Sequence, residues 1–172
     1  AAALAARDAV LDRHGPPLAF EWPNDLVWGR KKVGGVLAEW LSAGPAGPAA
    51  VAVGVGLNLG PDPREIDADS AGPAGPIALP ESATIREEVA ASFLGRLSQH
   101  IRCIGTEPGW HDALQSIRAI LLHSADQTVV LRLVDGTRVE GNPLDLKPDG
   151  TLVLRRTNGE TIEVRHAERW ID

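Results

Sequence analysis

The chain has 172 residues, a net charge of −6, and a hydrophobic content of 44%. That length fits one ordinary domain, or a moderate domain with a small one, and it can bury a core without disulfide bonds. The acidic balance argues against a nucleic-acid-binding surface, and no apolar run reaches the roughly 20 residues that span a bilayer. Cys103 is the only cysteine. We therefore expect no intrachain disulfide, a reducing cytoplasmic location, and a thiol buried among apolar neighbours.

The first 80 residues predict one helix followed by strands and loops. The alanine-rich start predicts an amphipathic helix that ends at Gly15-Pro16. Beyond it, short apolar runs alternate with segments rich in glycine and proline, a pattern typical of strands and their connections. We expect strands at 17–22, 26–28, 33–40 and 50–59, a hairpin turn at 29–31, and loops at 41–48 and 60–80.

The strand predicted at 50–59 has two unlike faces. Side chains alternate along a strand, so its apolar residues share one face and its glycines share the other with one asparagine. The first face holds Val53, Val55 and Leu57, and the second holds Gly54, Gly56 and Asn58. Glycine inside a strand usually marks a bulge or the close approach of a ligand or backbone. We expect the apolar face to be buried and the glycine face to be a floor for a flat small molecule with polar edges.

The second half of the chain predicts two helices and then a small β-unit. Apolar residues at three- and four-residue spacing predict a helix over 81–104, capped by Ser82 or Thr84. A second helix is expected over 110–122, after a break at Pro108-Gly109. Short β-rich runs separated by Asp-Gly and Asn-Gly pairs then predict hairpins of a small antiparallel barrel or sheet. We expect these strands at 128–134, 137–141, 151–156 and 161–164, with a domain boundary near 120–127.

Trp22-Pro23-Asn24-Asp25 is the most unusual local cluster. Pro23 keeps the residue before it out of helical geometry, so Asn24 and Asp25 follow an extended segment where the chain turns. Taken alone, the cluster is either a turn with side-chain-to-backbone hydrogen bonds or part of a polar site. Lys32, near the predicted hairpin turn, also has two interpretations from the sequence alone, a solvated cation or a functional one.

Three blocks taken together resemble the central domain of bacterial biotin protein ligases. They are WPND at 22–25, KKVGGVLAE at 31–39 and GVGLN at 54–58. Their order and gaps agree with the family's Lys-Trp-Pro-Asn-Asp block, Lys-Leu-Ala-Gly-Ile-Leu-x-Glu strand and Gly-x-Gly-x-Asn strand. The resemblance implies an α+β fold, with a mixed β-sheet packed against helices over residues 1–122, as in biotin and lipoate ligases. A small SH3-like β-barrel over residues 123–172 would follow it.

The resemblance also implies a reaction. Family members activate biotin with ATP to biotinyl-5′-AMP and pass biotin to one lysine of the biotin carboxyl carrier domain of a carboxylase. Lys32 matches the family's catalytic lysine, which contacts the biotin carboxylate and the reacting phosphate. A fixed ammonium there neutralises charge that grows when one anion attacks another. The implied substrates are biotin and ATP with Mg²⁺, and a homodimer is a further expectation.

Further positions carry over as substrate-binding residues. The expected set for biotin and the adenylate is Asn24, Asp25, Lys32, Gly35, Gly54 and Asn58. Asp25 is also a tentative Mg²⁺ ligand, because Mg²⁺ needs only one or two carboxylates beside phosphate oxygens. We expect Trp22 to pack rather than to contact substrate, and Glu39 to be structural.

Some features depart from the family's pattern. Gly34 stands where the family often has alanine, and Glu21 stands where it usually has lysine, which reverses a charge beside the site. The family's glycine- and arginine-rich nucleotide loop lies upstream of the first helix, and nothing here matches it. We therefore expect further residues before Ala1. Two alternatives remain open, a lipoate or octanoate ligase relative and a non-catalytic biotin-binding or carrier-docking module.

Overall fold

The structure is a computed structural model that describes residues 1–42, 49–60, 75–123, 125–167 and 169–171. Within these ranges the chain forms helices and two groups of strands. In chain order they are α1 Ala2–Asp12, β1 Ala19–Glu21, β2 Asp25–Trp28, β3 Lys31–Ser42, β4 Ala49–Leu57, α2 Ile85–Ile104, α3 Glu107–Ala119, β5 Val129–Arg132, β6 Arg138–Leu146, β7 Leu152–Arg155, β8 Thr161–Val164 and β9 Arg169–Ile171.

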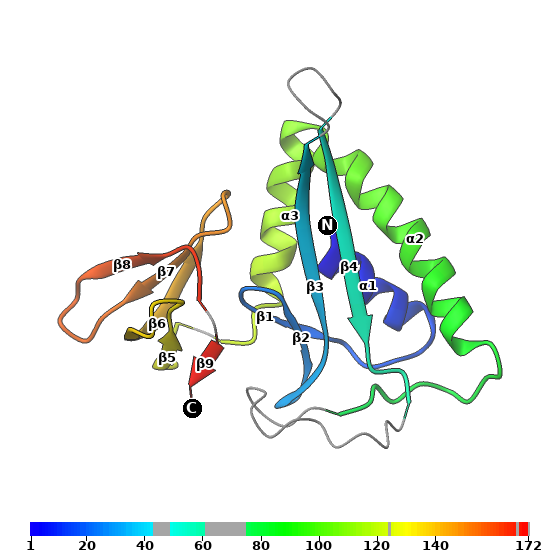
Figure 1. Ribbon diagram of the computed structural model, residues 1–172, viewed down its shortest axis with the longest axis horizontal. Helices are drawn as coiled ribbons and strands as arrows, with labels where there is room; N and C mark the ends of the chain where they lie inside the picture. The colour runs from blue at the N-terminus through cyan, green and yellow to red at the C-terminus, as the bar shows by residue number, and fades with distance from the viewer. Residues whose placement is uncertain (43–48, 61–74, 124, 168, 172) are drawn as a thin grey trace.

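The strands form two sheets. The N-terminal sheet has the order β1-β2-β3-β4, and the C-terminal sheet has the order β8-β7-β6-β5-β9. Strands within each sheet pair antiparallel, and a parallel bridge joins Phe20 to Leu121. The three helices lie on one side of the N-terminal sheet, and the C-terminal sheet lies beside that layered unit (Figure 1). The predicted α+β class is confirmed.

The first helix forms the centre of the N-terminal unit. Its buried residues are mostly alanine, which lets α2 approach closely along its length. The chain leaves this helix through His14, whose φ is 58°, and passes Gly15. A Cβ on Gly15 would lie 2.9 Å from the Val10 carbonyl oxygen, so this exit has no room for a side chain. The helix ends at Asp12, a little before the predicted end at Gly15-Pro16.

The other two helices differ in detail from prediction. Thr84 occupies the N-cap of α2 but makes no capping bond with its side chain, and its hydroxyl instead donates to Glu88 at 2.7 Å. The predicted start of α3 is wrong, because Pro108 and Gly109 lie inside its first turn. Proline is tolerated there since that N–H has no helical partner. Cys103 is exposed, which corrects the expected burial of its thiol.

The C-terminal sheet is built on the expected turns. The glycines of the Asp-Gly and Asn-Gly pairs all have positive φ, at 83° for Gly136, 83° for Gly150 and 85° for Gly159. Strand β6 runs beyond its predicted end because Pro143 lies at a register irregularity, where proline removes no regular ladder bond. Strand β9, of three residues, had no signal in the sequence.

Buried apolar side chains from both sheets form one continuous cluster. Its largest members include Leu18, Trp22, Leu26, Leu131, Leu152 and Leu154. Strand β1 also holds the segment after α3, because the Phe20 N–H donates to the Ile120 carbonyl and the Leu122 N–H donates to the Phe20 carbonyl. None of the helices in the described ranges has the length and apolar character that crossing a bilayer requires.

Candidate functional site

A β-bulge decides where Lys32 lies. In the β2–β3 pair, Asp25 is opposite Gly35 and Val27 is opposite Lys32, so two steps along β2 face three steps along β3. Regular alternation would put Lys32 and Gly35 on opposite faces. The extra residue, at Val33, returns them to the same face, together with Asp25. The lysine and the glycine that the sequence singled out are thus brought together by a local irregularity.

The glycines of β4 share this face. The β3–β4 register places Gly56 opposite Gly35 and Gly54 opposite Leu37. A Cβ built on Gly56 would meet no described atom within 4 Å, and one on Gly54 would meet only the Leu37 carbonyl oxygen at 4.0 Å. We call Gly35, Gly54 and Gly56 the glycine floor. The described part of the chain leaves the space above Gly54 and Gly56 open, as the alternation predicted.

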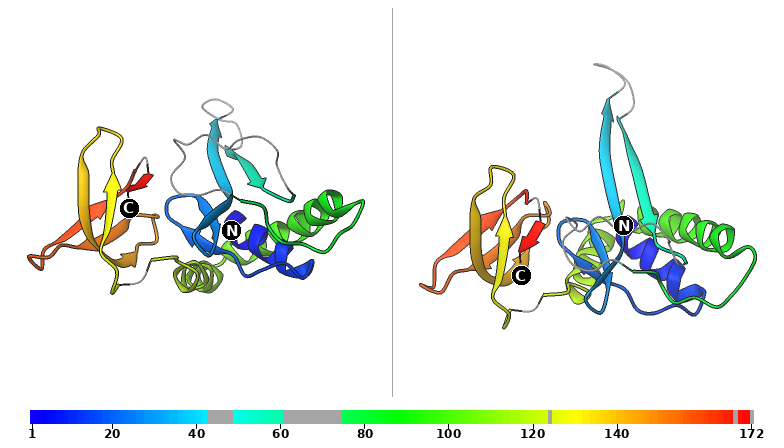
Figure 2. Two further views of the ribbon diagram at one scale, coloured as in Figure 1. Left: turned by 90° about the horizontal axis from the view of Figure 1, so that it is seen from below. Right: turned by 60° about the horizontal axis from the view of Figure 1, so that its bottom comes forward.

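The opposite face of β4 is buried only in part. Val55 and Leu57 pack against the core, whereas Val53 is 40% exposed and Val51 is 50% exposed. The outer half of the β3–β4 hairpin projects away from the helices, which explains this gradient (Figure 2). The expected burial of Val53 is therefore wrong, because the strand is longer than the layer that covers it.

An ion pair lies at the edge of the glycine floor. Lys32 Nζ is 2.7 Å from Asp25 Oδ1, and the Asp25 side chain is 16% exposed. Burial raises the pKa of the Asp25 carboxyl, the Lys32 ammonium opposes that rise, and the charge of Glu21 adds to it. An ammonium has three N–H donors, so one bond to Asp25 leaves donors that can meet a bound anion.

Glu21 lies directly opposite Asp25 in the β1–β2 pair. Like charges at directly opposed strand positions are unfavourable. Glu21 Oε1 lies 3.1 Å from His123 Nε2, so a histidine in the segment after α3 gives this carboxylate a hydrogen-bonding partner. The two residues are distant in sequence, and sequence reasoning missed this pairing.

Hydrogen bonds hold the WPND segment, residues 22–25, to β3 and to the C-terminal sheet. The Trp22–Pro23 peptide bond is cis. The Asn24 carbonyl accepts a hydrogen bond from the Val36 N–H at 2.8 Å, while the Asn24 side chain is exposed. Trp22 is buried, as predicted, but its indole Nε1 also donates to the Gly150 carbonyl of the C-terminal sheet at 2.9 Å. That bond joins residues 128 positions apart, so no local pattern could have indicated it.

Asn58 holds the chain that returns past the site. Its Nδ2 donates to the Gly75 carbonyl at 3.1 Å, and its own carbonyl accepts from the Ile77 N–H at 2.7 Å. The Gly75 N–H donates to the Lys32 carbonyl at 3.1 Å, which ties this segment to the catalytic candidate as well. A binding role for the Asn58 side chain stays a prediction. In the structure this side chain holds the backbone at Gly75.

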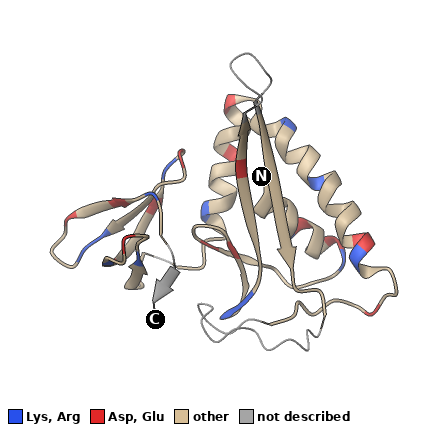
Figure 3. Ribbon diagram, viewed as in Figure 1, with Lys and Arg blue, Asp and Glu red and all other residues tan. Residues whose placement is uncertain are grey.

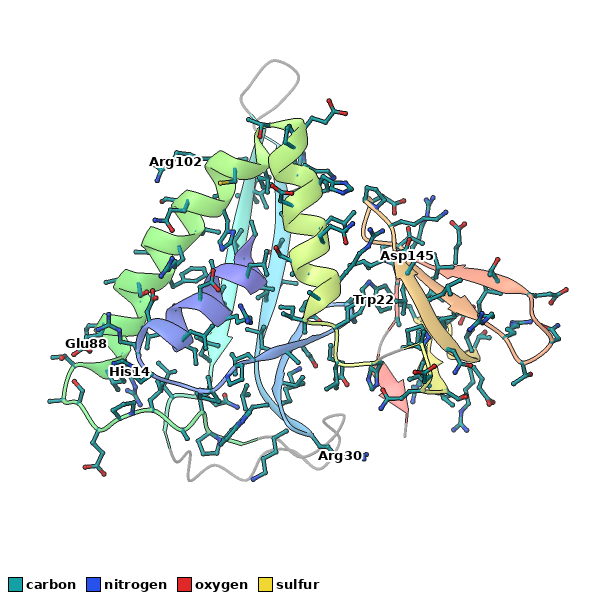
Figure 4. All side chains as sticks on the ribbon, turned by 180° about the vertical axis from the view of Figure 1, so that it is seen from behind. His14, Trp22, Arg30, Glu88, Arg102 and Asp145 are labelled. Atoms are coloured by element: carbon teal, nitrogen blue, oxygen red, sulfur yellow. The ribbon has the colours of Figure 1, made fainter. Side chains whose placement is uncertain are left out.

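Charges are distributed unevenly around the site. Lys and Arg residues lie at the β2–β3 turn, whereas residues 33–42 and 49–57 carry no charged side chain apart from Glu39 (Figure 3). Arg30 extends outward from that turn (Figure 4). The positive end of the floor suits an anionic group, and the uncharged middle suits an apolar or neutral ring.

No protein-family model matches the chain. Curated proteins do match it, and two of them are described here. The chain is 50% identical over 60 residues to a biotin--[acetyl-CoA-carboxylase] ligase of Paracoccus denitrificans, covering 34% of this chain and 25% of the relative. It is 33% identical over 105 residues to the enzyme of the same name from Mycobacterium tuberculosis, covering 57% and 36%. The matched region is thus about a third or less of these relatives' length.

Solved structures share the fold. A biotin protein ligase from Aquifex aeolicus matches with a TM-score of 0.71 and 23% identity, over 95% of this chain and 68% of that one. The same enzyme in complex with biotin and ATP matches with a TM-score of 0.70 and 23% identity, over 95% and 65%. A biotin protein ligase-like protein of unknown function from Silicibacter matches with a TM-score of 0.64 and 16% identity, over 95% and 68%.

Proposed function

We infer that this chain belongs to the biotin protein ligase family, and from that premise we propose that it acts in the ATP-dependent activation of biotin to biotinyl-5′-AMP. Transfer of biotin to a lysine of a biotin carboxyl carrier protein would follow. One observation carries the proposal. The bulge at Val33 sets Lys32 and Asp25 beside the glycine floor, so a cation and a side-chain-free surface meet at one place.

The first step joins two anions. A carboxylate oxygen of biotin attacks the α-phosphorus of ATP, the bond to the pyrophosphate oxygen breaks, and pyrophosphate leaves. Negative charge grows on the phosphate oxygens, and an ammonium held in advance stabilises that charge. Asp25 holds Lys32 Nζ at 2.7 Å and so fixes it before the substrates arrive. In the second step a lysine amine of the carrier attacks the acyl carbon, and AMP leaves.

The glycine floor would take the fused rings of biotin. A flat ring system can approach Gly35 and Gly54 closely only where no Cβ intervenes. Gly56, which the sequence did not assign to the site, belongs to the same open surface. We propose the exposed Asn24 amide and the Asn58 amide, which donates to the Gly75 carbonyl, as polar contacts to the adenylate.

Mg²⁺ is a finer part of the proposal. No group of three or more His, Cys, Asp or Glu side chains in the described residues could hold a metal. Asp25 and Glu21 are opposed carboxylates, and Mg²⁺ is commonly held by one or two carboxylates with phosphate oxygens. We propose Asp25 as a ligand only when the nucleotide supplies the remaining oxygens.

Titration calorimetry and carrier labelling test the proposal. Biotin is added first, then ATP with Mg²⁺, and release of pyrophosphate is measured. Labelling of a purified carrier domain with biotin supports the ligase. Biotin binding without pyrophosphate release assigns a non-catalytic binding module, and binding of lipoate or octanoate in place of biotin assigns the related branch. Either of these results would overturn the proposed activity.

The proposal has three finer parts. Residues 123–172 would form an SH3-like barrel, which the antiparallel order of the C-terminal sheet supports. The chain would form a homodimer, which the uncharged edge strand β4 supports. A cytoplasmic location remains a prediction from the single cysteine.

A further inference from the structure

The C-terminal sheet is attached directly to the segment that carries the candidate site. Trp22 is 4% exposed, and its Nε1 donates to the Gly150 carbonyl at 2.9 Å. Gly150 belongs to the turn between β6 and β7, where Asp149 Oδ1 accepts from the Thr151 N–H at 3.0 Å and fixes the turn. Trp22 lies between the two sheets (Figure 4). A rigid turn of one sheet therefore holds a buried side chain of the other.

Few contacts connect Trp22 to Lys32. Asn24, two residues on, accepts the Val36 N–H at 2.8 Å and so ties the segment to β3. Asp25, the next residue, lies opposite Gly35 and pairs with Lys32 at 2.7 Å. A displacement of Trp22 would thus reach the ammonium through one short stretch of backbone and one ion pair.

A second attachment of the C-terminal sheet avoids the site. Arg118 of α3 donates to the Leu146 carbonyl through Nε at 3.0 Å and Nη2 at 2.7 Å. The same guanidinium lies 2.7 Å from Asp145 Oδ1. This attachment involves α3 rather than residues 22–25. Substitutions at Arg118 and at Trp22 can therefore distinguish docking of the C-terminal sheet from positioning of the site.

We propose that Trp22 is a positioning residue, through which the turn at Gly150 keeps Asn24 and Asp25 in place against β3 and so sets the position of Lys32. The importance for catalysis rests on the function proposed above, whereas the mechanical coupling does not. Losing the indole donor leaves the Gly150 carbonyl without this partner and loosens the tripeptide that follows Trp22.

The test replaces only the donor. Trp22→Phe keeps an aromatic ring and removes the N–H, and incorporation of 3-benzothienylalanine at position 22 keeps the ring volume with sulfur in place of N–H. If Trp22→Phe fails to fold, the second variant still tests the proposal. Trp40→Phe is the matched control, since that indole is 70% exposed. Arg118→Gln loosens the other attachment.

The readout is amide exchange at Val36, whose N–H donates to the Asn24 carbonyl. We expect this exchange to accelerate about tenfold in both position-22 variants, as the loss of one hydrogen bond predicts. Trp40→Phe and Arg118→Gln should leave the exchange rate unchanged. Unchanged values in the position-22 variants, or equal changes in Arg118→Gln, would overturn the proposal.

Activity supplies a separate readout. In the full chain with biotin and ATP, kcat for adenylate formation should fall about tenfold while KM for biotin is retained, because the glycine floor is untouched. If the unmodified chain forms no adenylate, the proposed function fails, and the exchange rate at Val36 still decides the role of Trp22.

Discussion

Gly34 and Gly35 are neighbours in β3 but meet different surroundings. A Cβ on Gly34 would lie 2.4 Å from the Gly56 carbonyl oxygen, a distance that backbone cannot accommodate without moving. A Cβ on Gly35 would lie 3.4 Å from Asp25 Oδ1, which is an ordinary contact. Gly34 is therefore required by packing between strands, whereas Gly35 is open to a role at the site. This explains why the chain departs from alanine at position 34.

Gly34→Ala should destabilise the protein, by about 1–3 kcal/mol, as overpacking does elsewhere. Gly56→Ala is the matched control on the partner strand, because its Cβ would meet nothing described within 4 Å. Chemical denaturation of both variants gives the comparison. Equal unfolding midpoints for the two variants would contradict the close approach of β3 and β4.

Gly54→Val should separate stability from binding. Its Cβ would meet only the Leu37 carbonyl oxygen at 4.0 Å, so we expect an unfolding midpoint close to that of the parent chain. The added methyl groups would occupy the glycine floor, and biotin affinity should fall by at least about tenfold, the effect of losing roughly 1.4 kcal/mol. Calorimetric titration with biotin measures this, and unchanged affinity would refute the floor.

Lys32→Ala should lower adenylate formation about 10²–10³-fold, the usual loss when one preorganised charge-stabilising donor is removed. Lys31→Ala is the control, because Lys31 is adjacent in sequence and opposite Trp28 rather than beside Asp25. Pyrophosphate release reports the rate, and circular dichroism reports the fold. If Lys31→Ala lost more activity than Lys32→Ala, Lys32 would not be the catalytic lysine.

At the scale of elements, α1 and α2 are joined by a ladder of polar contacts. Asp12 accepts from Arg96 Nε at 2.9 Å and also from Ser92, while His100 lies 2.9 Å from Asp8 and Arg13 lies 3.2 Å from Glu88. Hydrogen bonds from Arg96 and Ser92 lower the pKa of Asp12 from 3.8 to about 2. This ladder continues the contact of the two helices beyond the alanine face of α1.

The sign of the Asp12 effect on stability follows from that depressed pKa. The unfolded carboxyl binds a proton near pH 3.8, before the folded one does near pH 2, so its stabilising contribution is present above pH 3.8 and lost as pH falls toward 2. The difference in unfolding free energy between the parent and Asp12→Asn should therefore shrink across that window. Denaturant melts at several pH values measure it, with the exposed Asp126→Asn as control. A difference that stays constant with pH would contradict the pairing.

The elements themselves were largely predictable because their signals are local. The three-four spacing indicated α2, and the Asp-Gly and Asn-Gly pairs indicated the turns of the C-terminal sheet. The bulge at Val33 was not predictable, since an alternation rule assumes an unbroken ladder. Nor was the bond from Trp22 to Gly150, which depends on how two distant segments pack. Residue identities at the site were therefore accessible from sequence, but their common face was not.

At the scale of the whole molecule, the projecting β3–β4 hairpin is the least covered feature. Leu37, Trp40, Leu41 and Val51 are each at least half exposed. Strand β4 lies at the end of the N-terminal sheet and carries no charged residue over Ala49–Leu57. A long uncharged edge with unpaired backbone groups favours pairing with another strand. This supports the proposed homodimer.

Val51→Lys should weaken self-association, because a lysine on an edge strand opposes strand pairing. Val134→Lys is the matched control, since Val134 is 75% exposed but lies in the C-terminal sheet's first turn region. Sedimentation velocity over a range of concentrations measures the change. A parent chain that stays monomeric at every concentration would dismiss the dimer outright.

The extra residue at Val33 decides which face of the sheet carries the Lys32 side chain. The residue numbers of Lys32 and Gly35 differ by an odd number. In an uninterrupted ladder the Lys32 ammonium would therefore lie on the face opposite the open glycines. A homologue that kept these residues but paired its strands without the bulge would present the lysine on the opposite face. The pairing register of the strands is thus as informative as the residue identities.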